Sequence, residues 1–333
     1  MKVFIIAEIG SVHDGSMGNA LRLVDVAAEC GADAVKFQTH IGEAESLANA
    51  PAPSFFSAES RLSYFKRTSF SLEQWKTLAR VSAERGLVFL SSPFSEEAVE
   101  LLERVGVNQY KVPSGEVTNL PLLERIARLK KPIILSSGMS SWNELDRAVE
   151  VIRREHNQLT ILQCTSEYPC AYERVGLNVM LEMRDRYQSP VGLSDHTLTP
   201  YASYAAVTLG ASIIERHVTF SRKMYGSDAK HSLEPDEFTE LIRGVRALEV
   251  ILASQVDKND LSRLGGMKEI FEKSLVALVD ICEGAIITRE MLGIKKPGSG
   301  IPAARLYEVV GKRMRRAVSA DTLLKFGDVQ GLM

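Results

Sequence analysis

Cysteine is scarce in this 333-residue sequence, and other marks of secreted or membrane proteins are absent. The four cysteines are scattered without any CxxC spacing, which argues against a disulfide framework or a zinc knuckle. No apolar run approaches the ~18 residues of a membrane span, and the N-terminus has no signal-peptide core or cleavage site. These absences predict a cytoplasmic protein with no membrane partner.

An excess of charge of one sign and short ligand motifs are also lacking. Lys and Arg number 40 and Asp and Glu number 42, so the formal net charge is -2, and only residues 312–316 form a basic run. This balance gives no indication of nucleic-acid binding. There is neither an HExxH metal motif nor a glycine-rich dinucleotide loop after the first apolar run. A metal site would therefore be assembled from residues far apart in the sequence.

Short β-rich runs alternate with amphipathic helical stretches along most of the chain. The runs are continuously apolar, as expected for parallel strands that are buried on both faces. Eight strand–helix units in roughly 250 residues predict a TIM (β/α)8 barrel, with a doubly wound open sheet as the alternative. The expected strands are residues 3–9, 34–38, 87–91, 109–112, 132–135, 159–163, 191–193 and 212–215.

The expected helices and domains follow from the same pattern. Residues 40–70 form a long, helix-poor insertion after the second strand, a candidate lid or interface arm. The barrel is expected to span residues 1–255, followed by a polar linker at 256–272 and a small domain at 273–333 that packs on its own barrel or a partner's. The expected barrel helices are residues 17–30, 71–85, 95–105, 120–128, 142–154, 177–187, 201–209 and 236–252.

Polar residues follow almost every expected strand. In a TIM barrel the reactive groups lie at the C-terminal ends of the strands. Buried lysines and carboxylates cost several kcal/mol unless they are paired, so a ring of them on one rim indicates a site rather than a folding requirement. The ring comprises Glu8, Lys36, Gln38, Ser91, Ser92, Lys111, Ser114, Glu116, Ser136, Ser137, Gln163, Thr165, Ser166, Asp195, His196, Glu215 and His217.

The residue types in this ring suggest three kinds of function. Lys36 and Lys111, with nearby serines, suit a ligand that carries a phosphate and a carboxylate. His196 and His217 follow neighbouring strands and could hold a metal ion that acts as a Lewis acid. One alternative is a Schiff-base aldolase that uses one of the lysines. The other is a barrel kept only for binding, which would have no need of this set of charged groups.

Ordered motifs along the barrel resemble the sialic acid synthase family of phosphoenolpyruvate-dependent nonulosonate synthases. They are IAEIG (6–10), HDG (13–15), GADAVKFQ (31–38), SPF (92–94), YKVPSGE (110–116), PIILSSGM (132–139), QCTSEYP (163–169), GLSDHT (192–197) and LGASIIERH (209–217). Residues 273–333 resemble the C-terminal antifreeze-like (SAF, β-clip) domain of the same family. No single motif is decisive, but their ordered combination is specific.

The resemblance implies an activity and roles for the residues. Phosphoenolpyruvate would condense with an N-acetylated aldose, and N-acetylmannosamine is the main candidate. The alternative is a legionaminic or pseudaminic acid synthase, in which the acceptor is a diacetamido-trideoxyhexose. His196 and His217 would hold Mn²⁺ or Mg²⁺, Glu8 would lie near the metal and the reacting carbons, and Glu116 would handle protons or contact the sugar. The expected substrate-binding residues are Lys36, Gln38, Ser92, Lys111, Ser114, Ser136, Ser137, Ser166, Tyr168, Ser194, Asp228 and Lys296. A domain-swapped homodimer is also implied, with the SAF domain of one chain over the partner's barrel.

Three positions depart from the family pattern. Ser166 stands where some members have asparagine, and Ala229 follows Asp228 where many have histidine, with His231 two residues later. Lys296 stands where some members have an SAF-domain arginine that reaches the partner's sugar site. Lysine supplies the charge but not the planar fork of a guanidinium group. The choice of sugar is therefore expected to depend on the loops that carry these three positions.

Overall fold

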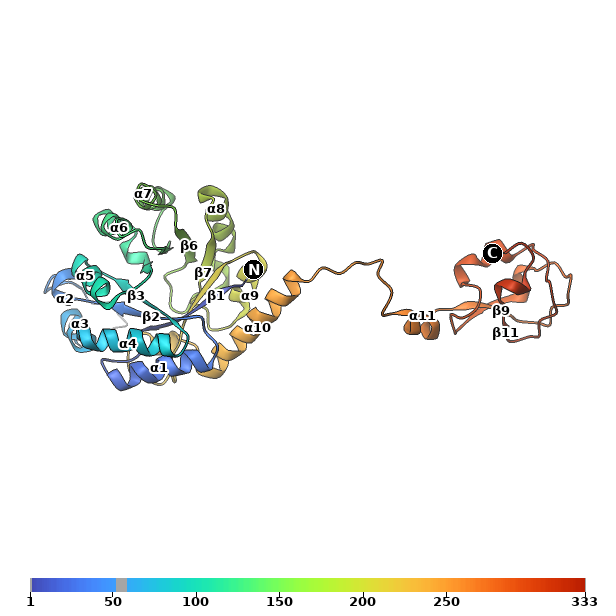
Figure 1. Ribbon diagram of the computed structural model, residues 1–333, viewed down its shortest axis with the longest axis horizontal. Coiled ribbons are helices and arrows are strands. Elements are labelled where there is room, and N and C mark those ends of the chain that lie inside the picture. Colours follow the sequence, from blue (N-terminus) through green and yellow to red (C-terminus); the bar gives the residue numbers. More distant parts are fainter. Residues whose placement is uncertain (1, 52–58, 333) are drawn as a thin grey trace. The chain divides into compact units, whose positions relative to one another are not determined.

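The computed structural model describes residues 2–51 and 59–332 (Figure 1). The chain divides into two compact units, Met1–Ser254 and Gln255–Met333, and each is described by itself. None of the helices within the described ranges is both long enough and apolar enough to cross a membrane.

The first unit is a parallel barrel sheet surrounded by helices (Figure 1). The hydrogen-bonded strand order is β3-β2-β1-β8-β7-β6-β5-β4, and β3 packs close to β4, so the barrel is nearly closed. The predicted TIM barrel is confirmed, and the open doubly wound sheet is wrong. The strands are β1 (Phe4–Gly10), β2 (Ala34–Thr39), β3 (Val88–Pro93), β4 (Tyr110–Val112), β5 (Ile133–Ser136), β6 (Leu159–Cys164), β7 (Val191–Ser194) and β8 (Ile213–His217).

Eight helices of the first unit match the expected segments to within two residues. Several begin where the sequence places a cap; Ser71, for example, forms a capping box with Gln74. They are α1 (Met17–Glu29), α4 (Leu72–Glu84), α5 (Glu96–Val105), α6 (Leu120–Ala127), α7 (Trp142–Arg153), α8 (Leu177–Tyr187), α9 (Tyr201–Thr208) and α10 (Pro235–Ala253). Single 3-10 turns also occur in this unit, namely η1 (Ser114–Glu116), η2 (Tyr172–Arg174) and η3 (Ala229–His231).

The insertion after β2 is not as helix-poor as expected. It contains α2 (Gly42–Glu45) and α3 (Arg61–Thr68), while residues 52–58 lie outside the described residues. Ser60 caps α3 by accepting a hydrogen bond from the Ser63 amide, and the Tyr64 and Phe65 side chains are buried against the barrel. The expectation failed because tertiary packing and a cap, rather than a long apolar periodicity, stabilise this short helix.

An apolar layer fills the barrel interior. It is formed by Ile6, Ala34, Leu90, Ile134, Leu162 and Ile213, each from a different strand. Gly192 of β7 lies between two of these strands: a Cβ there would be 2.3 Å from the Ile213 carbonyl oxygen and 2.7 Å from the Leu162 side chain. Only glycine fits this close approach, and the floor of the barrel is therefore packed solid.

The second unit is a small antiparallel domain with its own core. Its three strands are in the order β10-β9-β11, and apolar residues such as Leu275, Ile301 and Leu324 are fully buried beneath them. Ile281 and Val318 form an isolated bridge, and α11 lies inside the segment expected to be a linker. The elements are α11 (Gly265–Phe271), β9 (Ser274–Ala277), η4 (Arg289–Met291), β10 (Leu292–Lys295), η5 (Ala303–Arg305), α12 (Leu306–Val309), β11 (Thr322–Leu323) and η6 (Phe326–Asp328).

Candidate active site

A cavity of about 520 Å³ lies at the C-terminal ends of the barrel strands. We call it the lysine cavity, because Lys36 and Lys111 both line it. Most of the residues predicted from the sequence are brought together here. The predicted site residues in its lining are Glu8, Lys36, Gln38, Lys111, Ser114, Ser136, Ser166, Tyr168, Ser194, His196 and His217.

Strand alternation determines which polar residues face this cavity. Side chains alternate between the two faces of a strand, so the residue two positions after an interior apolar residue points to the same side. On β1, Glu8 therefore faces the same side as the interior residue Ile6. In the same way, Ser136 follows Ile134 on β5 and Glu215 follows Ile213 on β8. The strand register confirms the neighbourhood, since Glu8 pairs with Lys36 on one side and with His217 on the other.

Two buried lysines and two buried carboxylates form one ionic network in this cavity. Lys36 Nζ lies 2.8 Å from Glu8 Oε2 and 3.6 Å from Glu215 Oε1, and it donates a hydrogen bond of 3.4 Å to Ser92. Lys111 Nζ lies 3.4 Å from Glu215 Oε1 and donates to Ser136 at 2.8 Å. Glu215 therefore holds the two lysines together, although its role was not predicted beyond membership of the ring.

The two lysines differ in how well they are paired. Burial by itself would lower the pKa of each amine. The Glu215 and Glu8 carboxylates more than offset burial at Lys36 and raise its pKa above the ordinary value. At Lys111 burial prevails over Glu215, and the pKa is lowered. Lys111 is thus short of negative charge, and an anionic ligand in the cavity would supply it.

The two histidines lie close together in the lining of the lysine cavity. Their ring centroids lie 5.6 Å apart, and the Tyr168 ring packs 4.2 Å from that of His196. His196 Nδ1 lies 2.8 Å from the Thr165 carbonyl oxygen, so it carries the proton and leaves the Nε2 lone pair free. Burial and, to a smaller extent, the neighbouring His217 lower the pKa of His196 to about 4, so this ring is neutral near pH 7.

These imidazoles fit the requirements for a metal ion. A hydrogen bond from Nδ1 to a backbone carbonyl is the usual support of a histidine ligand, and His217 Nδ1 is buried without a hydrogen-bond partner. No group of three or more His, Cys, Asp or Glu side chains in the described ranges could hold a metal ion. A metal here would have two protein ligands and would take its other ligands from water or substrate.

A second, smaller cavity of about 230 Å³ adjoins the first. We call it the loop cavity, because Ser227, Asp228 and His231 in its lining come from the segment between β8 and α10, while Tyr64 and Phe65 come from the short helix α3. The two cavities share the side chains Gln38, Arg61, Phe94, Tyr168 and His217. His217 thus lies where the two cavities meet, next to His196.

Asp228, a predicted sugar contact, lies in the loop cavity. Its carboxylate accepts a 3.0 Å hydrogen bond from the Ser11 amide and one of 3.1 Å from the Ser227 hydroxyl. Gly10, with φ of +52°, makes room for it, because a Cβ there would be 2.5 Å from Asp228 Oδ2. A fixed carboxylate in a half-buried cavity can accept hydrogen bonds from sugar hydroxyl groups.

His40 also lines the loop cavity, although it was not among the predicted site residues. Its ring is stacked between those of Phe65 and Phe94, at centroid distances of 3.9 and 4.0 Å. Nδ1 lies 2.9 Å from Glu45 Oε2, and Nε2 lies 3.2 Å from Gln38 Oε1. Gln38 in turn donates its amide N–H to Glu8 at 2.8 Å. His40 therefore fixes the orientation of Gln38 against Glu8.

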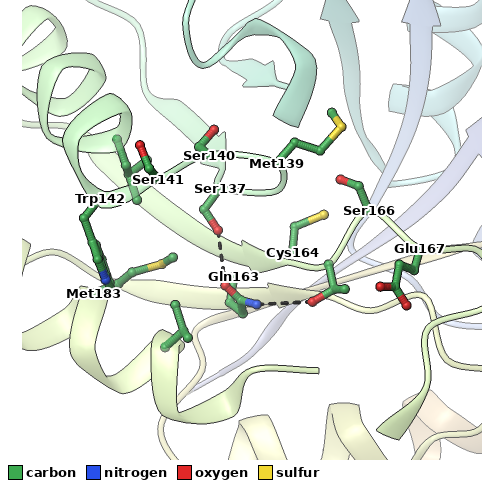
Figure 2. A pocket seen from close by; sticks show the side chains of 13 residues that line it. Ser137, Met139, Ser140, Ser141, Trp142, Gln163, Cys164, Ser166, Glu167 and Met183 are labelled. Carbon is green, nitrogen blue, oxygen red and sulfur yellow. Dashed lines mark hydrogen bonds between the residues drawn. The ribbon is translucent and has the colours of Figure 1, made fainter. Parts of the chain in front are cut away.

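Ser137 faces a different cavity from its neighbour Ser136. It donates a 3.3 Å hydrogen bond to Gln163, and both residues line an outer cavity of about 550 Å³ at the ends of β5 and β6 (Figure 2). Cys164 and Ser166 line both the outer cavity and the lysine cavity. Ser137 and Gln163 have the opposite strand parity to the interior residues, which explains their position.

The remaining predicted contacts lie outside the lining of the lysine cavity. Ser92 is buried and contacts Lys36 from the side. Glu116 accepts a 2.7 Å hydrogen bond from Asn119, and burial raises its pKa above the ordinary carboxylate value. Lys296 belongs to the second unit, where its amine lies 4.8 Å from the centre of the Phe271 ring.

Asp195 and His13 have structural contacts. The carboxylate of Asp195 is shared among Arg216, the Ser203 hydroxyl at 2.6 Å and the Thr197 amide at 2.8 Å, so it braces the loop that carries His196. His13 is buried against Phe70, and burial lowers its pKa to about 4. Asp195 was predicted as part of the polar ring at the strand ends. Its contacts are explained by folding rather than by contact with a ligand.

His40, Glu45 and Arg61 are the main site residues that sequence reasoning missed. All three lie in the insertion after β2, which the sequence predicts to be a lid or an interface arm. The apolar pair Tyr64 and Phe65 beside Arg61 was a signal that this segment packs on the barrel. Nothing local showed which polar groups would face inward.

The chain matches known families and proteins over nearly all its length. Residues 23–257 match the NeuB family, and residues 272–330 match the SAF domain. The chain is 37% identical over 332 residues to N,N'-diacetyllegionaminic acid synthase of Campylobacter jejuni, covering 97% of this chain and 99% of that protein. It is 38% identical over 325 residues to human N-acetylneuraminate-9-phosphate synthase, covering 96% and 90%. The solved N-acetylneuraminic acid (sialic acid) synthetase of Leptospira borgpetersenii, in complex with citrate, has a TM-score of 0.70 and 29% identity, covering 80% and 91%.

Proposed function

Since this chain belongs to the NeuB family and is an enzyme of the sialic acid synthase type, we propose that it condenses phosphoenolpyruvate with N-acetylmannosamine and water. The products would be a nine-carbon sialic-acid-type sugar and phosphate. The observation that carries this proposal is the lysine cavity, in which two buried amines and several hydroxyls lie beside two histidines. Such a site suits a small ligand with a carboxylate and a phosphate.

The chemistry assigns separate tasks to the residues. Lys36 and Lys111, with Ser114 and Ser136, would hold the carboxylate and the phosphate of phosphoenolpyruvate. Its C3 would then attack the aldehyde carbon of the open-chain sugar. A water would add to C2, and phosphate would leave with cleavage of the C–O bond at C2. Glu8, held between Lys36 and Gln38, would orient that water or take its proton.

We propose that His196 and His217 hold a divalent ion, Mn²⁺ or Mg²⁺. Bound there, the ion would polarise the sugar aldehyde as a Lewis acid. The support is the neutral, oriented ring of His196 and the buried, unpartnered Nδ1 of His217. The two protein ligands would leave coordination positions for water and the sugar oxygen.

The acceptor sugar is the least constrained part of the proposal. Identity to a legionaminic acid synthase and to an N-acetylneuraminate-9-phosphate synthase is nearly equal, at 37% and 38%. The alternative is therefore a legionaminic or pseudaminic acid synthase that uses a diacetamido-trideoxyhexose. Asp228, Tyr168 and His231 in the loop cavity are the contacts that would distinguish these acceptors.

We also propose a homodimer in which the second unit of one chain covers the partner's barrel. Several apolar side chains of α11, including Met267, Ile270 and Phe271, are about half exposed, at 55%, 59% and 55%. Exposed apolar groups of this size usually mark an interaction surface. Lys296, close to Phe271, would then approach the partner's loop cavity.

Phosphate release by the purified protein tests the function. Release should require both phosphoenolpyruvate and an N-acetylated sugar, and the panel should include N-acetylmannosamine and a diacetamido-trideoxyhexose. EDTA should stop the reaction, and Mn²⁺ or Mg²⁺ should restore it. Phosphate release without any sugar would contradict the condensation, and full activity in EDTA would contradict the metal site.

The Schiff-base alternative has one observation in its favour. The lowered pKa of Lys111 makes its amine a better nucleophile than an ordinary lysine. Borohydride reduction in the presence of pyruvate, followed by mass spectrometry, distinguishes a Schiff-base aldolase from the proposed condensation. We expect no adduct, because Lys111 is engaged with Ser136 and Glu215. An adduct on Lys36 or Lys111 would replace the condensation by an aldolase mechanism.

A further inference from the structure

Arg61 is a charged side chain at the junction of the two cavities. It is the first residue of α3 and lines both the lysine cavity and the loop cavity. Its Nε is buried and has no hydrogen-bond partner. In the described part of the chain, the structure places no carboxylate in an ion pair with this guanidinium group.

Aromatic packing holds Arg61 in place instead of a carboxylate. The guanidinium carbon lies 5.5 Å from the centre of the Phe65 ring, within the range of a cation–π contact. Phe65 is itself stacked on His40, whose other face lies against Phe94. The arginine is thus anchored on one face, while its N–H donors stay available to a ligand.

An available guanidinium group needs an oxygen acceptor. It cannot lose its proton in a protein and has five N–H donors but no acceptor of its own. A guanidinium group that lines a cavity and forms no ion pair there favours a ligand that supplies an oxygen. Because Nε itself is enclosed by protein atoms, that oxygen would approach the rest of the guanidinium group from the two cavities that Arg61 lines.

The surroundings indicate which kind of oxygen this is. Lys36 and Lys111 already provide the positive charge for an anion deeper in the lysine cavity. The loop cavity contains the Asp228 carboxylate, which would repel an anionic group. The lining of the loop cavity includes aromatic side chains, among them Phe65 and Phe94. A neutral carbonyl oxygen that carries a small apolar group fits both features, and an acetamido group is of this kind.

We propose that Arg61 determines specificity by donating a hydrogen bond to the carbonyl oxygen of an acetamido group on the acceptor sugar. The methyl group packs against the neighbouring phenylalanine rings. This assignment rests on the proposed function, because it requires an N-acetylated acceptor. In this assignment, a residue of the barrel unit recognises the N-acetyl group, and that residue lies in the insertion after β2.

Steady-state kinetics of Arg61→Met test the proposal, since methionine keeps the apolar length and removes every donor. With N-acetylmannosamine, kcat/KM for the sugar should fall about 10- to 100-fold, the loss of one charge-assisted hydrogen bond. The KM of phosphoenolpyruvate should change less than about twofold. Mannose, which lacks the acetamido group, should be used equally poorly by both proteins. Lys66→Met, at an exposed position on the same helix, is the matched control and should behave as the unaltered protein.

Three outcomes would overturn the assignment. They are unchanged kinetics, a loss confined to phosphoenolpyruvate, and an equal loss with N-acetylmannosamine and mannose. Thermal unfolding checks that Arg61→Met is folded, and Arg61→Lys should recover part of the loss because it restores one donor. Calorimetric titration with N-acetylmannosamine separates this proposal from the proposed function. If the unaltered protein binds the sugar without turnover, the synthase assignment fails, while weaker binding by Arg61→Met still supports the contact.

Discussion

The lysine cavity and the loop cavity are built in different ways. The first consists mainly of residues at strand ends, whose positions follow from the barrel register, and its charged groups pair with one another. The second consists of loop and short-helix residues around aromatic rings, and its lining includes Arg61, whose Nε has no hydrogen-bond partner among the described residues. We infer from this difference that the barrel strands determine the binding of phosphoenolpyruvate, whereas the loops determine which acceptor sugar is bound.

The largest effect is expected at the histidine pair, where the two cavities meet. His196→Ala should lower turnover by at least ~10³-fold, because a Lewis acid contributes several kcal/mol to the transition state. The melting temperature should stay close to that of the unaltered protein. Phosphate release and thermal unfolding are the measurements, with His156→Ala as a control in the loop before β6. Near-normal activity of His196→Ala would remove the metal from the mechanism.

Lys111→Met should affect one substrate only. We expect kcat/KM for phosphoenolpyruvate to fall by about 10²- to 10³-fold, the usual cost of losing a buried charged partner. Binding of the sugar alone, measured by calorimetry, should not change. The melting temperature should hold or rise, since burial lowers the pKa of Lys111 and Glu215 keeps Lys36 as its partner. A weaker affinity for the sugar would show that the two cavities are not separate in function.

The strand ends were predictable because alternation is a local rule. Once Ile6 and Ile213 are placed inside the barrel, Glu8 and Glu215 must face the same side. Ser136 and Ser137 show the limit of this rule, since alternation puts adjacent serines on opposite sides, and the structure is needed to show which of them faces the lysine cavity. His40 and Arg61 could not be found in this way, because their positions depend on how an insertion packs against Phe65 and Phe94.

His40→Leu should produce a smaller loss through the contact between the cavities. Leucine keeps the packing between Phe65 and Phe94 but removes the hydrogen bond that orients Gln38 towards Glu8. We expect kcat to fall about tenfold with little change in either KM, as one supporting hydrogen bond is lost. His40→Gln should recover part of this loss, because its amide can donate to Gln38. A rise in the KM of the sugar with unchanged kcat would make His40 a binding residue instead.

Lys296→Met should have the smallest effect, and it tests whether the second unit takes part in acceptor binding. A single exposed lysine contributes little, so the KM of the sugar should rise about two- to fivefold while that of phosphoenolpyruvate stays constant. Mixing this variant with inactive His196→Ala chains tests the swapped dimer. In mixed dimers an intact barrel would meet an intact second unit from the inactive partner, so the KM of the sugar should return towards normal. If mixing has no effect although chains exchange, Lys296 acts on its own barrel or not at all.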